Sequence, residues 1–587
     1  MNPHPSDRDP GAADAAGSNL VAPDSLAARV EAWIGDDPDE ETAAELAAVL
    51  AAMRTGDPNA SADAADRFSG LLQFGTAGLR GALGAGPNRM NRAVVIRAAA
   101  GLAAYMTDTL GGPGTVAIGY DARFKSDQFA IDTAAVMTAA GHRALLLPSA
   151  LPTPVLAFAV RELAADAGVM VTASHNPPQD NGYKVYLGGR IVRGAGEGAQ
   201  IVPPFDAEIA SRIARVESVA ATARAESGWN VIGDDLLAKY VAQTAALVGE
   251  PNAETRARRA AVTIVLTPLH GVGGATLDAV LRAAGFTDLH MVPEQAEPDP
   301  RFPTVTFPNP EEKGAMDLTL ALAEKVGAHV AIANDPDADR CAVAAVIDGR
   351  WTTLHGDRVG ALLGERLAAR AAAAGRTGTL ANSIVSSQIL ARIAERHRLA
   401  YESTLTGFKW ISRTEGLVFG YEEALGYCVA PDLVRDKDGI SAAVVIADLV
   451  AELAATGRTL ADALDAIDLE YGVYLTRQVS ARLESIDAAG AAVAAILVNP
   501  PTELGGSAVT VAEDMNLGID GLPPTPGLRV ATVNGARVII RPSGTEAKVK
   551  AYLEVIEPVT GTLADARAAA ERLMAELESD VHAALGV

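Results

Sequence analysis

The chain has 587 residues, with 49 Lys or Arg against 73 Asp or Glu, and a formal net charge of −24. So acidic a chain does not suit a nucleic-acid-binding protein held by phosphate contacts or a polybasic membrane binder. Hydrophobic residues make up 49% and charged residues 21%, which is typical of globular domains. At about 150 residues per domain, this length accommodates about four domains.

Cysteine usage and the start of the chain both bear on localisation. The two cysteines, Cys341 and Cys428, are too few for a disulfide framework and favour a reducing cytoplasm. The first residues carry Pro, Asp and Gly where a signal peptide needs an apolar run. The apolar stretch 144–160 is too short and too interrupted by proline for a membrane span. We therefore expect a cytoplasmic protein with no nucleic-acid or membrane partner.

Residues 1–60 are predicted to form an acidic N-terminal tail and helical extension. Residues 1 to 22 are a low-complexity run of Pro, Gly, Ala and Asp, for which we expect disorder. The segment 25–54 has the composition of one or two surface helices.

Farther along, short apolar strands alternate with helices in three series. The first has strands at 115–120, 143–147 and 168–172 and a helix at 127–140. The second has strands at 262–267, 288–292 and 329–333 and helices at 275–284 and 314–326. The third has strands at 379–383 and 399–405 and helices at 387–397 and 440–455. This alternation predicts βαβ units and largely parallel sheets.

The C-terminal part has a different pattern, with strands predicted at 471–483, 508–512, 528–533, 536–540 and 548–555. Asn534-Gly535 is typical of a tight hairpin turn, and a helix at 563–585 follows. The predicted fold class is α/β, with three similar mixed α/β domains, largely parallel sheets and a C-terminal α+β domain around a central cleft. The predicted domains are 61–232, 233–350, 351–470 and 471–587.

The sequence Thr-Ala-Ser-His-Asn-Pro at 172–177 directly follows a predicted strand. Ligands of open α/β sheets bind beyond the carboxyl ends of strands, so Ser174 is placed to carry a covalent group. Alternatively, Ser174 and Asn176 only bond the backbone of a turn. Because His175 is adjacent to Ser174, we expect their side chains not to face each other as a dyad.

Three carboxylates, Asp335, Asp337 and Asp339, follow another apolar strand. At alternate positions of an extended loop they can converge on one hard cation, and oxygen ligands suit Mg²⁺. An EF-hand loop is excluded, because its sixth and twelfth positions are Arg340 and Val346. The alternative is a solvated acidic turn, although three such carboxylates repel one another without a compensating charge.

Three further loops contain groups that suit sugar or phosphate recognition. Gly-Tyr-Glu-Glu-Ala-Leu-Gly at 420–426 offers carboxylates to sugar hydroxyls, or is a solvated strand end. Arg-Pro-Ser-Gly-Thr-Glu-Ala-Lys at 541–548 offers a guanidinium, hydroxyls and backbone N–H groups to a phosphate, without Walker spacing. Phe-Gly-Thr-Ala-Gly-Leu-Arg-Gly at 74–81 is a weaker signal, and it follows no clear strand as a dinucleotide fingerprint requires.

In order and spacing, the segments at 172–177, 335–340, 420–426 and 541–548 resemble the four signature loops of the α-D-phosphohexomutase superfamily, which contains phosphoglucomutases and phosphomannomutases. The resemblance covers roughly residues 60–587. Thr-Gly-Phe-Lys-Trp at 406–410 and the helical extension resemble the phosphoglucomutase-2-like branch.

The resemblance implies a role for each motif residue. Ser174 would be the phosphoserine that shuttles the phosphoryl group, and it would bind one Mg²⁺ together with Asp335, Asp337 and Asp339. The reacting centre would be lined by Arg80, His175, Lys184, Arg340 and Lys437. The sugar would contact Glu422, Lys409 and Gly407, and the non-transferring phosphate would lie against Arg541, Ser543, Gly544 and Thr545.

The implied reaction is an intramolecular phosphoryl transfer between sugar 1-phosphate and sugar 6-phosphate, for glucose or mannose, with a sugar bisphosphate as intermediate and activator. Lys184 or Lys437 would act as the base, with a pKa lowered by burial among cations. One position departs from the pattern of many family members, because Ala424 stands where they have a serine. This difference favours, as the alternative to a hexose mutase, a phosphopentomutase acting on ribose 1-phosphate. A Mg²⁺-dependent phosphatase and a sugar-phosphate sensor are remoter alternatives. We expect a monomer or weak homodimer.

Overall fold

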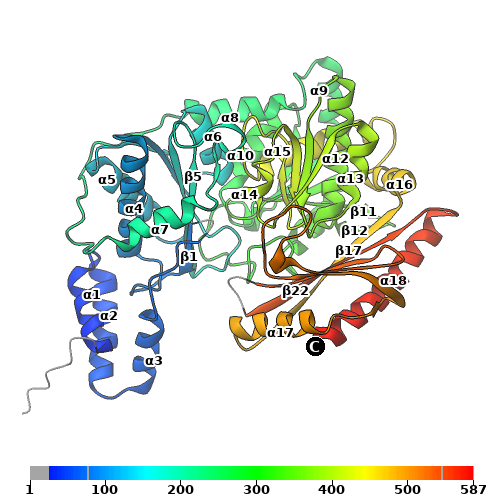
Figure 1. Ribbon diagram of the computed structural model, residues 1–587. Coiled ribbons are helices and arrows are strands. Elements are labelled where there is room, and N and C mark those ends of the chain that lie inside the picture. The colour runs from blue at the N-terminus through cyan, green and yellow to red at the C-terminus, as the bar shows by residue number, and fades with distance from the viewer. Residues whose placement is uncertain (1–24, 76–77, 544–546, 586–587) are drawn as a thin grey trace, which may run out of the picture.

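The computed structural model describes residues 25–75, 78–543 and 547–585. Within these ranges the chain forms four sheets that follow one another along the sequence, preceded by a helical extension (Figure 1). The predicted fold class is confirmed: three mixed α/β units precede a unit with an antiparallel sheet. The predicted tail at 1 to 22 lies outside the described residues.

The extension contains three helices, α1 (Leu26–Asp36), α2 (Glu40–Arg54) and α3 (Pro58–Arg67). The first two confirm the one or two helices predicted at 25–54, and the third follows that segment. Ser25, Asp39 and Asp57 cap their N-termini with side-chain oxygens. Helix α3 was not predicted because its sequence is polar and proline-led, yet proline suits the first helical turn. Asp36 accepts a bond from the backbone N of Val219 at 2.8 Å, which fixes the extension to the first α/β unit.

The first sheet has the order β1-β5-β4-β2-β3-β7, with β6 paired to β5. Strands β2, β3, β4 and β7 run parallel, whereas β1, β5 and β6 pair antiparallel. The strands are β1 (Gly78–Ala82), β2 (Thr115–Tyr120), β3 (Arg143–Leu146), β4 (Ala167–Val171), β5 (Asp180–Leu187), β6 (Ala199–Gln200) and β7 (Asn230–Val231). The helices are α4 (Arg92–Leu110), α5 (Ser126–Ala139), α6 (Thr153–Glu162) and α7 (Phe205–Ala214).

Among the described residues, α4 is the one helix long and apolar enough to cross a membrane. Most of that helix is buried inside the first unit, where it packs between α5 and α7. Its apolar composition is therefore that of a core helix.

The second sheet has the order β12-β11-β10-β8-β9, and the third has the order β14-β13-β15-β16. The second unit contains β8 (Thr263–Thr267), β9 (Asp288–Met291), β10 (Val330–Ala333), β11 (Ala342–Ile347), β12 (Arg350–Thr353), α8 (Asp235–Ala246), α9 (Ala253–Ala260), α10 (Gly273–Ala283) and α11 (Asp317–Val326). The third contains β13 (Thr379–Ser383), β14 (Ala400–Thr404), β15 (Leu417–Glu422), β16 (Gly426–Cys428), α12 (Gly356–Ala373), α13 (Ile389–His397), α14 (Phe408–Ile411), α15 (Gly439–Ala454) and α16 (Leu460–Tyr471).

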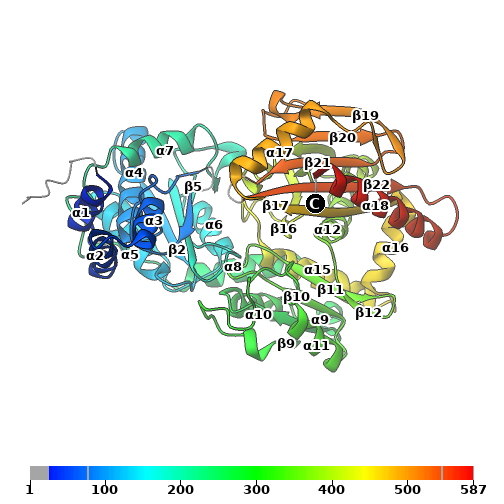
Figure 2. The same ribbon diagram turned by 90° about the horizontal axis from the view of Figure 1, so that it is seen from below.

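The fourth sheet, β17-β22-β21-β20-β19-β18, is antiparallel throughout and lies beside the third unit (Figure 2). Its strands are β17 (Val473–Arg482), β18 (Glu503–Leu504), β19 (Ser507–Asp514), β20 (Leu528–Thr532), β21 (Arg537–Pro542) and β22 (Lys548–Glu557), with helices α17 (Ile486–Val498) and α18 (Leu563–Leu585). The expected hairpin at Asn534-Gly535 joins β20 to β21.

The hydrophobic core is shared unequally among these units. One continuous cluster of buried side chains runs from one face of the first sheet through the second and third units. The fourth unit has a separate cluster, formed by its sheet together with α17 and α18. The first three units are thus joined through their interiors, whereas the fourth has a core of its own and meets the third through a smaller cluster that includes Ile384 and Ile539.

Candidate active site

Ser174 lies just beyond the carboxyl end of β4 and is 3% exposed. Its backbone is in the left-handed region, with φ of 52°, and its N–H donates to Thr172 Oγ1 at 2.8 Å. Its Oγ donates to Asp335 Oδ2 at 2.8 Å, although the two residues lie 161 positions apart. The structure therefore joins the candidate nucleophile of the first unit to the carboxylate loop of the second.

The expectation that Ser174 and His175 do not face each other is wrong. Ser174 Oγ and His175 Nδ1 are 3.1 Å apart, because the left-handed turn at Ser174 brings the next side chain back onto it. Burial, with Arg340 and Arg80 nearby, holds the pKa of His175 well below its usual value, so the ring is neutral.

Arg123 holds the whole Ser174 loop, and the sequence patterns did not single it out as a site residue. Its Nη1 donates to the carbonyl oxygens of Pro177 at 2.8 Å and Asp180 at 3.1 Å. Its Nη2 donates to the carbonyl oxygens of Ser174, at 2.6 Å, and of Asn176. A planar guanidinium can hold four carbonyls in this way, whereas a lysine ammonium cannot reproduce the fork.

The same guanidinium lies over the ring of Phe302 in the second unit, 5.0 Å from its centroid. We expect Arg123→Lys to reduce turnover about tenfold to a hundredfold, because the loop carrying Ser174 loses its fixed shape. Steady-state kinetics beside a thermal melt provide the measurement. The matched control is Arg92→Lys, which disturbs a bidentate pair with Asp132 elsewhere in the same unit. An equal loss of turnover in both variants would argue against a positioning role.

Asp335, Asp337 and Asp339 converge as the sequence predicted, and all three are buried. One carboxylate oxygen of each lies within 4.8 Å of the others. Asp337 Oδ1 and Asp339 Oδ1 are buried and accept no hydrogen bond within the described residues. Burial, with Asp337 and Asp339 beside it, raises the pKa of Asp335 well above its usual value. Unused, mutually repelling carboxylate oxygens are what a hard divalent cation would satisfy.

Lysines and Arg340 surround this triad. Lys184 Nζ donates to Asp337 Oδ2 at 2.7 Å and to Asp339 Oδ2 at 2.8 Å. Arg340 donates its backbone N–H to Asp335 Oδ1 at 3.0 Å, and its Nε lies 3.9 Å from Asp339 Oδ1. Lys437 Nζ lies 3.4 Å from Asp339 Oδ2.

The expected lowering of the pKa of Lys184 and Lys437 is wrong for this arrangement. Burial alone would lower the pKa of Lys184, but Asp337 and Asp339 outweigh it and raise the pKa. Asp339 and Asp436 do the same for Lys437. Asp337 and Asp339 lie 153 and 155 positions from Lys184 in the sequence, whereas Asp436 directly precedes Lys437.

Arg80 comes from edge strand β1 and donates from Nη1 to Asn176 Oδ1 at 3.2 Å, so it borders the Ser174 loop. Thr153, at the start of α6, donates from Oγ1 to Asp337 Oδ2 at 2.7 Å. This further link between the first and second units was not predicted.

The loop at 420–426 lies at the end of β15. Burial raises the pKa of Glu422, and Lys437 and Arg340 oppose that rise, so these two cations are close to it. A backbone bridge between Arg340 and Gly426 joins this loop to the loop at 335–340. Tyr421 is buried between the rings of Phe419 and Tyr427 and does not reach the loop surface.

Glu423 accepts hydrogen bonds from Ser383 Oγ at 3.0 Å and from Ser386 Oγ at 2.9 Å. Burial, with Glu422 and Asp357 nearby, raises its pKa to about 7. A carboxyl group whose pKa is raised on folding adds most to the free energy of unfolding at pH values below its pKa in the unfolded chain. For Glu423 this contribution is lost as the pH rises through 7.

We therefore expect Glu423→Gln to stabilise the protein relative to the native chain more at pH 8 than at pH 5. Glutamine keeps an acceptor for both serines and removes the charge. Denaturant unfolding at the two pH values measures the difference, and the exposed Glu415→Gln provides the control. An equal change at both pH values would contradict the expectation.

Gly407, with φ of 105°, precedes the short helix α14, which carries Lys409. Burial lowers the pKa of Lys409 to about 8, and its Nζ lies 5.9 Å from the centroid of the Trp410 ring.

On the fourth unit, Arg541 donates from Nη1 to Thr406 Oγ1 of the third unit, and from Nη2 to Thr525 Oγ1 at 3.3 Å. The backbone N–H of Ser543 donates to the carbonyl of Lys548 at 2.8 Å. Gly544 and Thr545 lie outside the described residues. Contacts therefore link the loops at 172–177, 335–340 and 420–426 to one another, and the described part of the loop at 541–548 contacts the segment 406–410.

Three family models match the chain: phosphoglucomutase/phosphomannomutase α/β/α domain I at residues 71–220, domain II at 238–346 and domain III at 355–469. The "probable phosphomannomutase" of Haemophilus influenzae is 47% identical over 468 residues, covering 79% of this chain and 93% of that protein. The phosphopentomutase of Homo sapiens is 35% identical over 558 residues, covering 84% of this chain and 86% of that protein. The chain belongs to the phosphoglucomutase/phosphomannomutase family of the α-D-phosphohexomutase superfamily.

Among solved structures, the chain resembles the open form of the Paramecium phosphoglucomutase pp63/parafusin, with a TM-score of 0.64. The match covers 88% of this chain and 96% of that one at 18% identity, so it supports the fold alone.

Proposed function

We propose that the protein is a sugar-phosphate mutase that interconverts hexose 1-phosphate and hexose 6-phosphate, for glucose or mannose, through a phosphoserine at Ser174. The hydrogen bond of 2.8 Å between Ser174 Oγ and Asp335 Oδ2 carries this proposal, because it puts a buried hydroxyl against a carboxylate cluster. Family membership supports the class of reaction.

In the forward half-reaction the Ser174 O–P bond breaks and a bond forms between phosphorus and a free sugar hydroxyl oxygen, whose proton passes to a base. The resulting bisphosphate turns round, and its other phosphoryl group returns to Ser174. Phosphoryl transfer depends mainly on positioning and charge neutralisation. Arg340 and Arg80 lie close to His175 and would neutralise the transferring group, and the neutral His175, 3.1 Å from Ser174 Oγ, would orient it.

Asp335, Asp337 and Asp339, together with the phosphoserine, would hold one Mg²⁺. The unused oxygens of Asp337 and Asp339 fit a hard cation. When bound, the ion supplies charge neutralisation to the phosphoryl oxygens. Lys184 bridges two of these carboxylates and is positioned to keep them oriented.

The rest of the substrate would lie across the third and fourth units. Glu422, with Lys437 nearby, would accept hydrogen bonds from sugar hydroxyls, and Gly407 and Lys409 would border the ring. Arg541 and Ser543, with Gly544 and Thr545, would bind the non-transferring phosphate. The contact of Arg541 with Thr406 supports this, because it brings the phosphate loop next to Gly407.

Ribose 1-phosphate is the second candidate substrate, favoured by Ala424, which leaves one hydroxyl of the usual sugar loop missing. Turnover of glucose 1-phosphate, mannose 1-phosphate and ribose 1-phosphate, with Mg²⁺ and the matching bisphosphate, tests the choice. Faster hexose conversion supports the first proposal, and faster ribose conversion supports the second. Release of inorganic phosphate would indicate a phosphatase, and binding without turnover a sensor.

Two further properties complete the proposal. The domains are 61–232, 233–350, 351–470 and 471–587, after the extension at 1–60, and the protein acts in the cytoplasm as a monomer or weak dimer. Cys341 and Cys428 are both free and buried, which supports a reducing compartment.

A further inference from the structure

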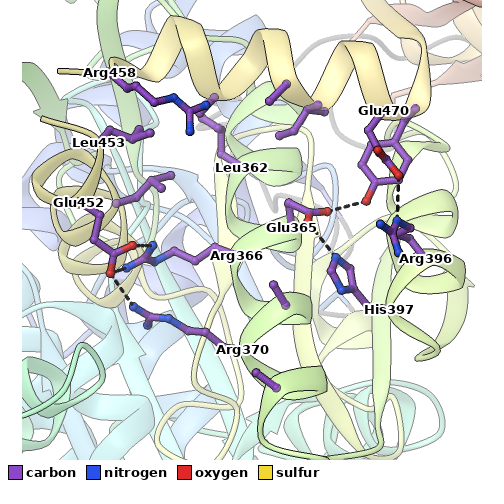
Figure 3. Close-up of a pocket in the computed structure, with 17 residues that line it drawn as sticks. Leu362, Glu365, Arg366, Arg370, Arg396, His397, Glu452, Leu453, Arg458 and Glu470 are labelled. Carbon is purple, nitrogen blue, oxygen red and sulfur yellow. Dashed lines mark hydrogen bonds and ion pairs between the residues drawn. The ribbon is translucent and has the colours of Figure 1, made fainter. Parts of the chain in front are cut away.

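A cavity of about 760 Å³ lies in the third unit, away from every signature loop. Helices α12, α15 and α16 and the end of α13 form its walls (Figure 3). This volume is in the range that holds small organic ligands.

One end of the cavity carries an excess of positive charge. Arg366 holds Glu452 with both terminal nitrogens, at 2.6 and 2.9 Å, and Arg370 donates to Asp448 Oδ2 at 2.9 Å. Asp448 is 1% exposed. Arg258 and Arg259, from α9 of the second unit, also lie within salt-bridge distance of Asp448. Four guanidinium groups thus share two carboxylates.

Part of this positive charge is not matched by a carboxylate. Arg366 has both terminal nitrogens on carboxylates, because Nη2 also donates to Asp448, whereas the side chain of Arg370 is 36% exposed. Burial, with Arg366 beside it, lowers the pKa of Arg370. Arg458, at the rim, adds a further cation to the same end (Figure 3).

The remaining walls are apolar or already paired. Leu362, Leu449, Leu453 and Ile467 form the apolar surface. At the opposite end Glu365 accepts from Tyr471 OH at 2.7 Å and lies 2.8 Å from His397 Nε2, so the polar groups there are already paired.

We propose that this cavity binds an organic anion with an apolar body, its phosphate or carboxylate head against Arg366 and Arg370 and its body along the leucines. An anion there would receive charge-assisted hydrogen bonds from donors that two carboxylates leave partly unused. The apolar part would cover Leu362, Leu449 and Leu453, which separates this ligand from a bare sugar phosphate.

Both helices that carry the charged end begin beside the candidate active site. Asp357, in the first turn of α12, accepts from Tyr421 OH at 2.9 Å, directly before Glu422. Helix α15 begins just after Lys437, with Asp438 as its N-cap. At about 1.5 Å per residue, the cavity lies roughly 14 to 20 Å farther along these helices. Occupancy of the cavity therefore regulates turnover, an effect that rests on the proposed function.

The test measures the binding of 1-naphthyl phosphate to the full chain by the fluorescence of this probe. Inorganic phosphate and 1-naphthol, the two halves of the probe, are compared with it. Arg370→Gln is expected to weaken binding about tenfold, because one charge-assisted contact is lost. Glu452→Gln is expected to tighten it several-fold, because Arg366 is released to the ligand. Neither residue belongs to the candidate active site.

Weaker probe binding in Arg370→Gln together with tighter probe binding in Glu452→Gln supports the site, because a damaged fold would not bind the probe more tightly. Equal affinity in the native chain and both variants, or equally strong binding of 1-naphthol, would overturn it. Mutase turnover is then measured with the probe present. A change of at least about twofold, absent in Arg370→Gln at the same probe concentration, supports regulation. Unchanged turnover at saturation would overturn the regulatory step but not the binding site, and the binding assay stands even if the mutase proposal fails.

Discussion

Replacing Ser174 by alanine is expected to lower mutase turnover by at least about a thousandfold while leaving the protein folded, because no other group can accept the phosphoryl group. The variant loses the hydrogen bonds of Ser174 Oγ with Asp335 and His175 but creates no large cavity. A coupled assay of glucose 1-phosphate conversion, beside a thermal melt, measures both effects.

A buried serine elsewhere provides the control for that experiment. Ser387 Oγ donates to Glu554 Oε1 at 2.7 Å, so Ser387→Ala also removes a buried serine–carboxylate bond, outside the signature loops. Its turnover should stay within about threefold of the native value. Turnover near the native value in Ser174→Ala would falsify the assignment of the nucleophile.

The second large effect concerns the metal site. We expect Asp335→Asn to reduce turnover by about a hundredfold or more and to weaken Mg²⁺ binding, because a charged ligand is lost. Without metal the same variant should be at least as stable as the native chain. Its amide oxygen can still accept from the backbone N–H of Arg340, while its amide N–H donates to Ser174 Oγ. Burial and repulsion from Asp337 and Asp339, which raise the pKa of Asp335, no longer act on a carboxylate.

Calorimetric titration with Mg²⁺ and denaturant unfolding in a chelator give the two readouts. Asp132→Asn is the matched control, because Asp132 is paired bidentately with Arg92 and lies outside the metal cluster. That control should lose stability and keep turnover. If Asp335→Asn loses stability in the chelator as Asp132→Asn does, the repulsion argument is wrong.

Local pattern predicted much of the fold, because many strands of the α/β units are short apolar runs between clear turns. The strand at 115–120 coincides with β2, and that at 379–383 with β13. Helix α4 was missed because it is buried on most sides and therefore lacks an amphipathic period. Strand β1 was missed because glycine is rare in strands; at Gly78 a Cβ atom would lie 1.8 Å from the carbonyl oxygen of Tyr183.

The candidate site shows the same division between local and distant information. The convergence of Asp335, Asp337 and Asp339 was predictable, since five consecutive positions carry all three. The role of Arg123 was not, because the carbonyls it holds lie 51 to 57 positions away. The sign of the pKa shift of Lys184 also depends on carboxylates in another unit.

The separate interior of the fourth unit has a consequence for how stability is measured in this chain. We expect the continuous interior to make the first three units one cooperative block, and the sheet of β17–β22 with α17 and α18, joined to the third unit by a smaller buried cluster, to melt in a separate transition. One melting temperature would then not describe the whole molecule. Variants at Ser174 and Asp335 should be judged from the transition of the three-unit block, and substitutions around Arg541 from that of the last unit.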